Sequence, residues 1–433
     1  VVLVTLGIAV LTGLLFGAMP ALQATRAALG QTLREAGRGL HGSAGRRMRS
    51  ALIVAEMALA VVLLVGAGLL IRSFIELTRV DPGFRAEQAI AFRISMDATS
   101  YAEGPHLRDF VDGLLERVTA TAGVSAAGGT GVLPLRGRGA LINFNVEGAP
   151  PPPENVNMEI GYYGVTPGYF EAIGTPVVRG RDFSSQDRPD APRVALINET
   201  GARFWFPGED PIGRSVVVGS GTREIVGVVA DVLQRDPATP MMPQLFAPYA
   251  QRTTRNLQIV ARTSGDPLLV APALRTRIRS MDPAMPISDF TPLRQVVAES
   301  VSRPRFYTSL LSLFAALALT LAAIGIFGVL SYAVTQRARE ISIRMALGAQ
   351  RAGVIRMIVG TSMTLAGLGL VAGIAGAAAL GRVISSQLYN VRPMDPMTLV
   401  AVVIVLTGTA LAASYLPARR AAALDPGTAL RDG

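Results

Sequence analysis

The side chains that most often carry catalytic chemistry are scarce in this sequence. It contains no cysteine and no lysine, so the 41 residues counted as lysine or arginine are all arginine. Without cysteine, thiolate catalysis, disulfides and zinc–thiolate sites are excluded. Without lysine, an ordinary P-loop is excluded too, because that loop needs a lysine on the nucleotide phosphates. We therefore expect any ATP hydrolysis that drives this protein to be performed by another polypeptide.

The other residues suited to catalysis or metal binding do not form a site. The two histidines, His41 and His106, lie on opposite sides of a predicted membrane-spanning helix, so they do not predict a shared metal ion or a catalytic dyad. Carboxylates are plentiful in residues 76–304, but no pair of them sits beside a histidine, a metal-spaced cluster or a nucleophile elbow. We predict that the chain is not an enzyme and binds no metal or cofactor.

Five long apolar segments indicate a membrane protein. Half of the 433 residues are hydrophobic, and the mean hydropathy of +0.40 fits spanning helices averaged with a soluble domain. Each segment is long enough to cross about 30 Å of hydrocarbon. The segments are Val1–Met19, Ser50–Ile71, Phe306–Val334, Val354–Leu380 and Thr398–Leu416. The lipid bilayer is therefore a predicted partner, and we attribute the arginine excess to composition bias rather than to nucleic-acid binding.

Residues 76–304 have the pattern of a large α+β domain. Short apolar stretches at 193–198 and 224–229 predict strands. Apolar residues at helical spacing predict helices at 107–121 and 268–281. The predicted fold class is an α-helical transmembrane bundle with five spans plus a large extracytoplasmic α+β domain.

Arginines in the short loops predict the orientation in the membrane. They cluster in residues 26–49 and again in residues 335–352, so both segments are predicted to be cytoplasmic. The tail after the last span is basic as well, whereas the connection 385–396 is nearly neutral because Arg392 and Asp395 offset one another. The α+β domain is therefore predicted to lie outside the cytoplasm.

An internal repeat predicts a duplicated architecture. The segment that begins at Pro20 is similar to the one that begins at Pro417, and at the same offset Leu33-Arg-Glu35 falls on Leu430-Arg-Asp432. Both copies follow an apolar segment on the predicted cytoplasmic side. We predict that residues 1–25 are the last helix of one transmembrane half and that a complete second half follows.

The loop between the third and fourth apolar segments, residues 336–350, predicts a short amphipathic helix. It carries charged residues at Arg337, Glu340 and Arg344 among apolar ones, and Gly348 ends it. Such a helix lies on a surface. From spacing alone, a helix held by lipid headgroups and a helix docked on a partner protein are equally well supported.

This loop resembles the coupling loop of the FtsX/MacB-type permease family of ABC transporters. The family pattern is R-x-x-E-I-x-I-R-x-A-L-G-A, and residues 337–349 match it at each fixed position. The resemblance implies that the loop seats in an ATPase subunit, which favours docking over lipid. The residues assigned to the coupling loop are Arg337, Arg339, Glu340, Ile341, Ile343, Arg344, Ala346, Leu347, Gly348 and Ala349.

A second set of motifs resembles the periplasmic core domain of the same family, so the resemblance covers residues 46–433. The motifs are Thr166–Phe170, Gly180–Phe183, Val194–Glu199, Phe204–Gly213 and Val226–Asp231. We read them as structural. The aromatic side chains expected to fill the core are Tyr169, Phe170, Phe204, Trp205 and Phe206. Asp182 and Asp231 are expected to cap helices or to bond the backbone.

The resemblance also implies a division into domains. The segments are 1–25, the last transmembrane helix of a preceding permease half; 26–49, a cytoplasmic linker; 50–75, the first transmembrane helix of the second half; 76–304, a periplasmic MacB-like core domain; and 305–433, an FtsX-like permease domain with three transmembrane helices and the coupling loop 335–352.

The implied function is that of the permease subunit of an ABC transporter in a bacterial inner membrane. A separate ABC-type ATPase would use the ATP, and its hydrolysis would move the periplasmic domain for export or envelope work. Another permease half or a periplasmic protein is a further partner compatible with this architecture. A membrane-anchored sensor or scaffold without transport activity is the alternative.

Three residues inside the predicted spans call for a structural or functional explanation. Glu56 is an intramembrane charge, which is costly in hydrocarbon. It either reaches the cytoplasmic surface or pairs with a neighbouring helix, or it forms a helix contact that changes during transport. Gly369 and Gly373 form a small-xxx-small pair and predict close helix packing, with lipid-facing glycines as the alternative.

Overall fold

The computed structural model describes residues 41–101, 104–148, 159–219, 221–288, 290–336, 350–385 and 388–422. The first predicted span and the coupling-loop residues 337–349 lie outside these ranges. The chain divides into two compact units. One, which we call the helical unit, combines residues 1–65, 315–380 and 399–433; the other, the α+β unit, combines residues 66–314 and 381–398.

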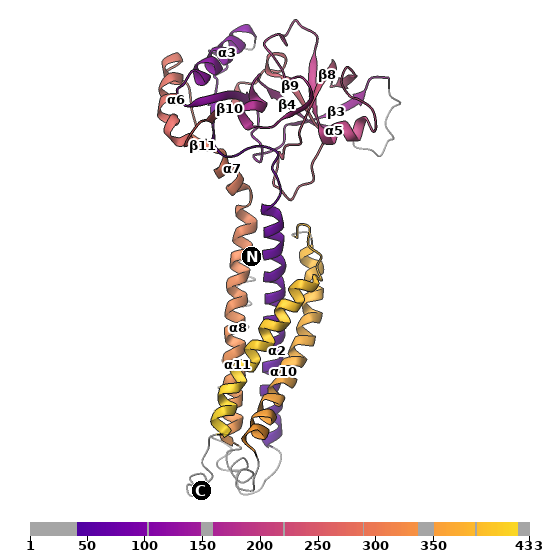
Figure 1. Ribbon diagram of the computed structural model, residues 1–433, viewed down its shortest axis with the longest axis vertical. Coiled ribbons are helices and arrows are strands. Elements are labelled where there is room, and N and C mark those ends of the chain that lie inside the picture. The colour runs from indigo at the N-terminus through magenta and orange to yellow at the C-terminus, as the bar shows by residue number, and fades with distance from the viewer. Residues whose placement is uncertain are drawn as a thin grey trace. The chain divides into compact units, whose positions relative to one another are not determined.

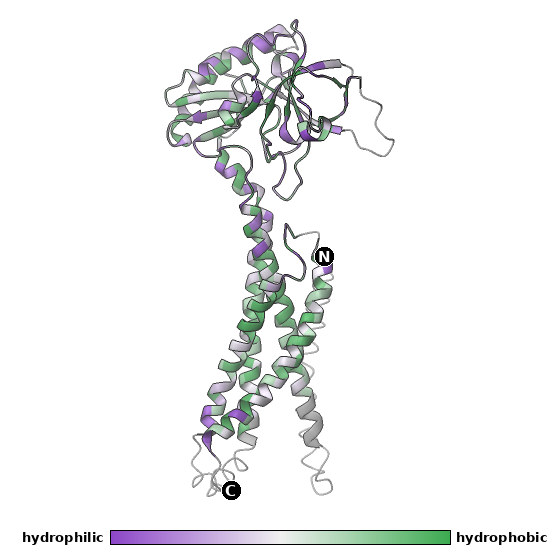
Figure 2. Ribbon diagram, turned by 45° about the vertical axis from the view of Figure 1, so that its right-hand side comes forward, coloured by the Kyte–Doolittle hydropathy of each residue, from purple (hydrophilic) through white to green (hydrophobic). Residues whose placement is uncertain are grey.

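Among the residues that the structure describes, four helices are long and apolar enough to cross a membrane. They are α2 (His41–Thr78), α8 (Ser302–Gln336), α10 (Arg351–Ile384) and α11 (Pro396–Ala422). Their apolar parts are Ser50–Thr78, Ser302–Tyr332, Arg351–Ile384 and Pro396–Arg420. Figure 2 shows that hydrophobic residues dominate these helices, whereas hydrophilic residues are mixed through the strands and shorter helices. Four of the five predicted spans are thus confirmed as long apolar helices, and the other lies outside the described residues.

The α+β unit contains one continuous sheet and five short α-helices among its described residues (Figure 1). The strands are β1 (Ala89–Ser95), β2 (Val124–Thr130), β3 (Ala140–Val146), β4 (Glu159–Val165), β5 (Val177–Gly180), β6 (Val194–Asn198), β7 (Ser215–Val218), β8 (Gly221–Val229), β9 (Gln244–Pro248), β10 (Asn256–Thr263) and β11 (Thr291–Pro292). The helices are α3 (Pro105–Thr119), α4 (Tyr169–Ile173), α5 (Glu199–Trp205), α6 (Pro267–Met281) and α7 (Leu293–Ser300). The strands predicted at 193–198 and 224–229 and the helices predicted at 107–121 and 268–281 are confirmed.

The first part of the sheet is an open antiparallel ladder in the order β11-β1-β10-β2. Alternation along β1 explains its two faces, because side chains two residues apart point the same way. Ile90 and Phe92 pack under α3 and α6, while Ala89 and Ala91 face the opposite core. Both faces of this ladder are therefore buried.

The second part of the sheet closes on itself. The pairings run β4-β3-β7-β8-β6-β9, and β9 then pairs with β4 in parallel, so six strands form a small barrel. Its interior is apolar and holds Phe144, Ile160, Leu245 and Val228. Closing the ring leaves none of these six strands with a free edge, which stabilises the barrel against edge-to-edge pairing.

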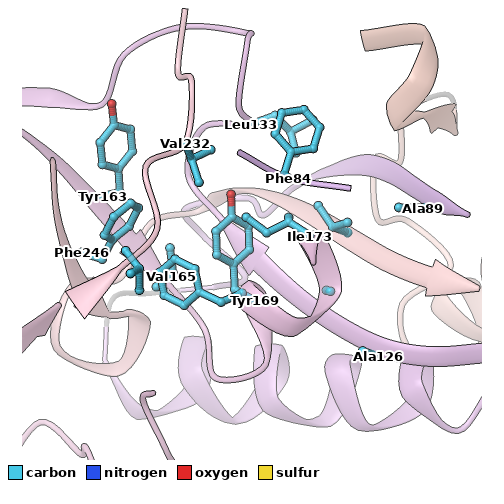
Figure 3. Close-up of a cluster of buried hydrophobic side chains, with 14 of the residues drawn as sticks. Phe84, Ala89, Ala126, Leu133, Tyr163, Val165, Tyr169, Ile173, Val232 and Phe246 are labelled. Carbon is cyan, nitrogen blue, oxygen red and sulfur yellow. The ribbon is translucent and has the colours of Figure 1, made fainter. Parts of the chain in front are cut away.

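An aromatic core joins the two parts of the sheet (Figure 3). Figure 3 shows Tyr163 and Phe246 lying side by side, with ring centroids 5.4 Å apart. Phe170 meets Phe246 edge-on at 5.1 Å. Gly128 is required here, because a side chain at this position would collide with the backbone of Tyr169. The motif Thr166–Phe170 thus serves core packing.

The prediction that Phe204 lies in the core was wrong. Tyr169, Phe170 and Phe206 are buried and Trp205 is partly buried, but Phe204 is 56 % exposed. Helical geometry gives the reason, since residues i and i+4 share a face: Phe206, just after α5, packs inward with Ala202, and Phe204 points away. The predicted roles of the two aspartates are confirmed. Asp182 accepts from the Phe183 N–H at 2.7 Å, and Asp231 accepts from the Thr200 N–H at 2.8 Å.

Candidate functional site

The coupling loop joins two of the long apolar helices. Helix α8 ends at Gln336 and helix α10 begins at Arg351. The carbonyl of Gln350 accepts hydrogen bonds from the N–H groups of Gly353 at 2.9 Å and Val354 at 3.4 Å, so α10 starts directly after the loop. Residues 337–349 themselves are not described, and their conformation and their docking on an ATPase stay predictions.

Glu56 lies between two helices of the helical unit. Its side chain is partly buried, and its carboxylate occupies the space that a side chain on Gly325 of α8 would need. A methyl group on Gly325 would lie 3.2 Å from the carboxyl carbon of Glu56 and closer still to its Oε2. Among the described residues, Glu56 has no ion-pair partner. The structure therefore places this carboxylate against the α8 backbone, at a helix contact.

Gly369 and Gly373 lie against helix α2. A methyl group on Gly369 would come within 2.5 Å of Met57 Cβ and 3.0 Å of the Val54 carbonyl oxygen. One on Gly373 would come within 2.8 Å of the Ala58 carbonyl oxygen and would collide with Val61. Such distances leave room for hydrogen only, so the two glycines let the backbones of α2 and α10 approach closely. We call this contact the glycine seam.

A polar contact in the α+β unit was not predicted from the sequence. Arg72 Nη1 of α2 donates to Asp395 Oδ1 at 2.5 Å. The other carboxylate oxygen, Oδ2, accepts from the N–H and the hydroxyl of Thr398 at 2.9 and 2.8 Å. The next residue of α2 adds a second contact, in which the Ser73 hydroxyl accepts from the Tyr389 N–H at 2.8 Å. These five residues, which we call the helix clasp, fasten the α10–α11 connection to α2.

The sequence contained part of the signal for the helix clasp. Asp395-Pro396-Met397-Thr398 reads as a helix start, with an acidic cap followed by proline at the first helical position. In the sequence, the charge of Asp395 offsets that of the nearby Arg392. In the structure, Asp395 pairs instead with Arg72, which lies 323 residues away in sequence. Local patterns predict the cap and cannot predict so distant a partner.

Helix α2 is the common member of these contacts. Within the helical unit, its residues 54–61 contact α8 and α10. Within the α+β unit, its residues 68–73 contact the start of α11 and the α10–α11 connection, and the Leu70 carbonyl accepts from the Thr308 hydroxyl of α8 at 3.4 Å. A continuous helix cannot stretch, because its hydrogen bonds fix a rise of about 1.5 Å per residue.

The described ranges contain no group of three or more histidine, aspartate or glutamate side chains close enough to hold a metal ion. The expectation that the chain binds no metal or cofactor and is not an enzyme stays a prediction.

The architecture defines a membrane protein with spanning helices and an α+β domain between the first two of the described spans. Residues 50–277 match the sequence profile of the MacB-like periplasmic core domain, and residues 312–426 match that of the FtsX-like permease C-terminal region. The chain belongs to the family of FtsX-like permeases with a MacB-like periplasmic core domain. The α+β domain is therefore periplasmic.

Curated relatives are similar over part of their length. A macrolide export ATP-binding/permease protein MacB of Marinobacter nauticus is 31 % identical over 271 residues, which are 59 % of this chain and 40 % of that protein. A probable export ATP-binding/permease protein of Pseudomonas fluorescens is 26 % identical, over 69 % of this chain and 46 % of that protein. The chain thus spans less than half the length of these relatives.

Among solved structures, the periplasmic region of MacB from Actinobacillus actinomycetemcomitans is similar to this chain at 13 % identity and a TM-score of 0.35. The similarity covers 51 % of this chain and 95 % of that one.

Proposed function

We propose that this chain is the permease of an ABC transporter in a bacterial inner membrane, and that it couples ATP hydrolysis by an ABC-type ATPase to movement of its periplasmic domain. The observation that carries the proposal is the loop at residues 337–349, which lies inside the matched permease region and follows the family's coupling pattern. The names of the two relatives support the proposal, since each joins an ATP-binding part to a permease part.

Each element of the chain has a role in this proposal. The coupling loop receives the motion of the ATPase, and α8 and α10 leave the loop at its two ends. The glycine seam and the contact of Glu56 with Gly325 couple both helices to α2. The long helices α2 and α8 continue into the two ends of the periplasmic domain, so a displacement along them reaches it. Export or work on the cell envelope is the output.

Co-purification tests the input step. The protein would be expressed with a tag and purified in mild detergent, as the native form and as Glu340→Arg plus Arg344→Glu. An ABC-type ATPase from the same organism should accompany the native form and be lost from the double variant, because the swap reverses charge on the docking face.

A matched control swaps charges far from the loop. Glu116→Arg plus Arg117→Glu changes two exposed side chains of α3 and leaves the net charge unchanged, as the loop variant does. This control should retain the ATPase. If no ATPase accompanies any form, docking at the loop is disproved, and the membrane-anchored sensor or scaffold takes its place.

A further inference from the structure

Two arginines lie over the ring of Tyr162 at the barrel of the periplasmic domain, and a third lies close to one of them. The guanidinium carbon of Arg252 lies 4.1 Å from the centroid of the Tyr162 ring, and that of Arg223 lies 5.7 Å from it. Arg193 completes the group, since its guanidinium fills the space beside Gly221, two residues before Arg223. We call Arg193, Arg223 and Arg252 the arginine cluster.

Arg223 is buried without a countercharge. It is 7 % exposed, and its Nη1 donates to two neutral acceptors, the Val194 carbonyl at 3.2 Å and Gln251 Oε1 at 2.8 Å. Burial lowers the pKa of the Arg223 guanidinium, and the positive charges of Arg193 and Arg252 lower it further. Removing a charge from water is costly unless the charge is paired.

No carboxylate of the described residues forms an ion pair with any member of the arginine cluster, although seven arginines elsewhere in those residues have such partners. Arg193 is exposed and Arg252 is half-buried, so the cluster reaches from the barrel interior to its surface. The cluster therefore presents positive charge to solvent over a buried positive charge that the fold leaves unneutralised.

The neighbours of the cluster hold it in place. The Gln251 amide donates to the carbonyls of Arg188 at 3.2 Å and Pro192 at 3.1 Å, which turns its oxygen toward Arg223. The face of the Tyr162 ring attracts the guanidinium of Arg252. Guanidinium groups match carboxylate and phosphate oxygens in pairs of parallel hydrogen bonds.

We propose that the arginine cluster binds the carboxylate or phosphate group of a periplasmic ligand. An oxyanion there would lie against Arg193 and Arg252 and would supply the charge that buried Arg223 lacks. This assigns a ligand chemistry to a domain whose motifs otherwise serve packing, and it does not depend on ATP coupling.

Hydrogen–deuterium exchange of the full chain in lipid nanodiscs tests the site. Sodium phosphate and sodium citrate would be titrated separately, each against sodium chloride at the same ionic strength. We expect either or both to slow exchange in residues 159–165, 221–229 and 249–252 beyond the effect of chloride, and the two arms separate a phosphate ligand from a carboxylate ligand. Equal protection by chloride, or no protection by either anion, would overturn the proposal.

Two variants separate binding from folding. Arg193→Gln removes an exposed member of the cluster. It should raise the half-saturating anion concentration about tenfold, as expected for a lost charge-assisted contact. Arg277→Gln on α6, also exposed, is the matched control and should bind as the native chain does. Arg223→Met should abolish anion protection, because it removes the buried positive charge that the anion would neutralise. Unchanged binding in Arg193→Gln, or anion protection that persists in Arg223→Met, would show that the cluster is structural.

Discussion

At the scale of single residues, each of the two carboxylate oxygens of Asp395 forms a different contact. Oδ2 caps the first turn of α11, and Oδ1 binds Arg72 of α2. We predict that Asp395→Ala lowers the free energy of unfolding by about 1–2 kcal/mol, mainly through the lost cap. The contribution of the ion pair is smaller because the Arg72 side chain is 41 % exposed and water screens it. Titration with sodium dodecyl sulfate in mixed micelles measures this change.

An ion pair at the C-terminal end of α2 provides the comparison. Arg79 and Glu76 are three residues apart near the end of α2, and their charged atoms are 3.3 Å apart. Glu76→Gln should change the free energy of unfolding by less than about 0.5 kcal/mol. If Asp395→Ala proves as mild as Glu76→Gln, the helix clasp does not hold α2.

Asp187 predicts an acid-dependent contribution to stability. Burial alone would raise its pKa, but bonds from the Arg181 guanidinium at 2.9 and 2.8 Å and from the Ser184 N–H hold the pKa below its usual range. A carboxylate with a lowered folded-state pKa stabilises the fold above the ordinary aspartate pKa and loses that contribution as the pH falls through the lowered value. The native chain should therefore exceed Asp187→Asn in thermal midpoint at neutral pH.

The difference between the two should shrink as the pH falls below about 4, where the unfolded carboxylate takes up its proton. Melting curves of both forms from neutral to acidic pH measure it. A difference that stays constant over this range would contradict the assignment of Asp187 as a charged partner of Arg181.

Residue-scale predictions from the sequence succeeded where they named a kind of bond and failed where they depended on spatial position. Asp182 and Asp231 bond the backbone as expected. Phe204 was placed in the core on its residue type alone, whereas its position on α5 decides its exposure. The arginine cluster was missed because its members come from three separate segments, and only the closed barrel brings them together.

At the scale of elements, the glycine seam gives a direct test of helix packing. Gly373→Ala should lower the free energy of unfolding by about 1–3 kcal/mol, because its methyl group would meet the Ala58 carbonyl and Val61 on α2. Gly367→Ala is the matched control on the same helix, since a methyl group there has open space. It should be neutral or slightly stabilising, as alanine favours helix over glycine. Equal effects of the two substitutions would argue for lipid-facing glycines.

The contact between α2 and α8 is expected to be more tolerant. A methyl group on Gly325 would displace the flexible end of Glu56 rather than backbone. Gly325→Ala should therefore destabilise less than Gly373→Ala in the same titration. The reverse order would mean that the Glu56 carboxylate is held more firmly than its partial burial implies.

Elements with strong periodicity were predictable, and their pairing was not. The long apolar helices and strand β6 follow from runs of apolar residues in the sequence. Closure of the barrel depends on the parallel pairing of β4 with β9, whose residues lie about 80 positions apart, and no local pattern encodes that register. The glycine seam was predictable in kind, through small-xxx-small spacing, but its partner α2 was not.

At the scale of the whole molecule, the proposed function depends on coupling between the loop and the periplasmic domain. Helices α2 and α8 enter and leave the periplasmic domain, the helix clasp ties α2 to the α10–α11 connection, and the coupling loop lies between α8 and α10. An ATPase that moves the loop should therefore change the periplasmic domain. Family membership establishes the parts, and we predict that motion is transmitted between them.

Pulsed electron paramagnetic resonance tests that claim most directly, because the chain has no cysteine of its own. Spin labels would be placed at Arg277→Cys and Arg419→Cys, both exposed, with the ATPase bound in nanodiscs. We predict that ATP shifts the distance distribution between the labels in the native loop and not in Glu340→Arg plus Arg344→Glu. An unchanged distribution with the ATPase bound and ATP present, or an equal shift in the loop variant, would contradict the account.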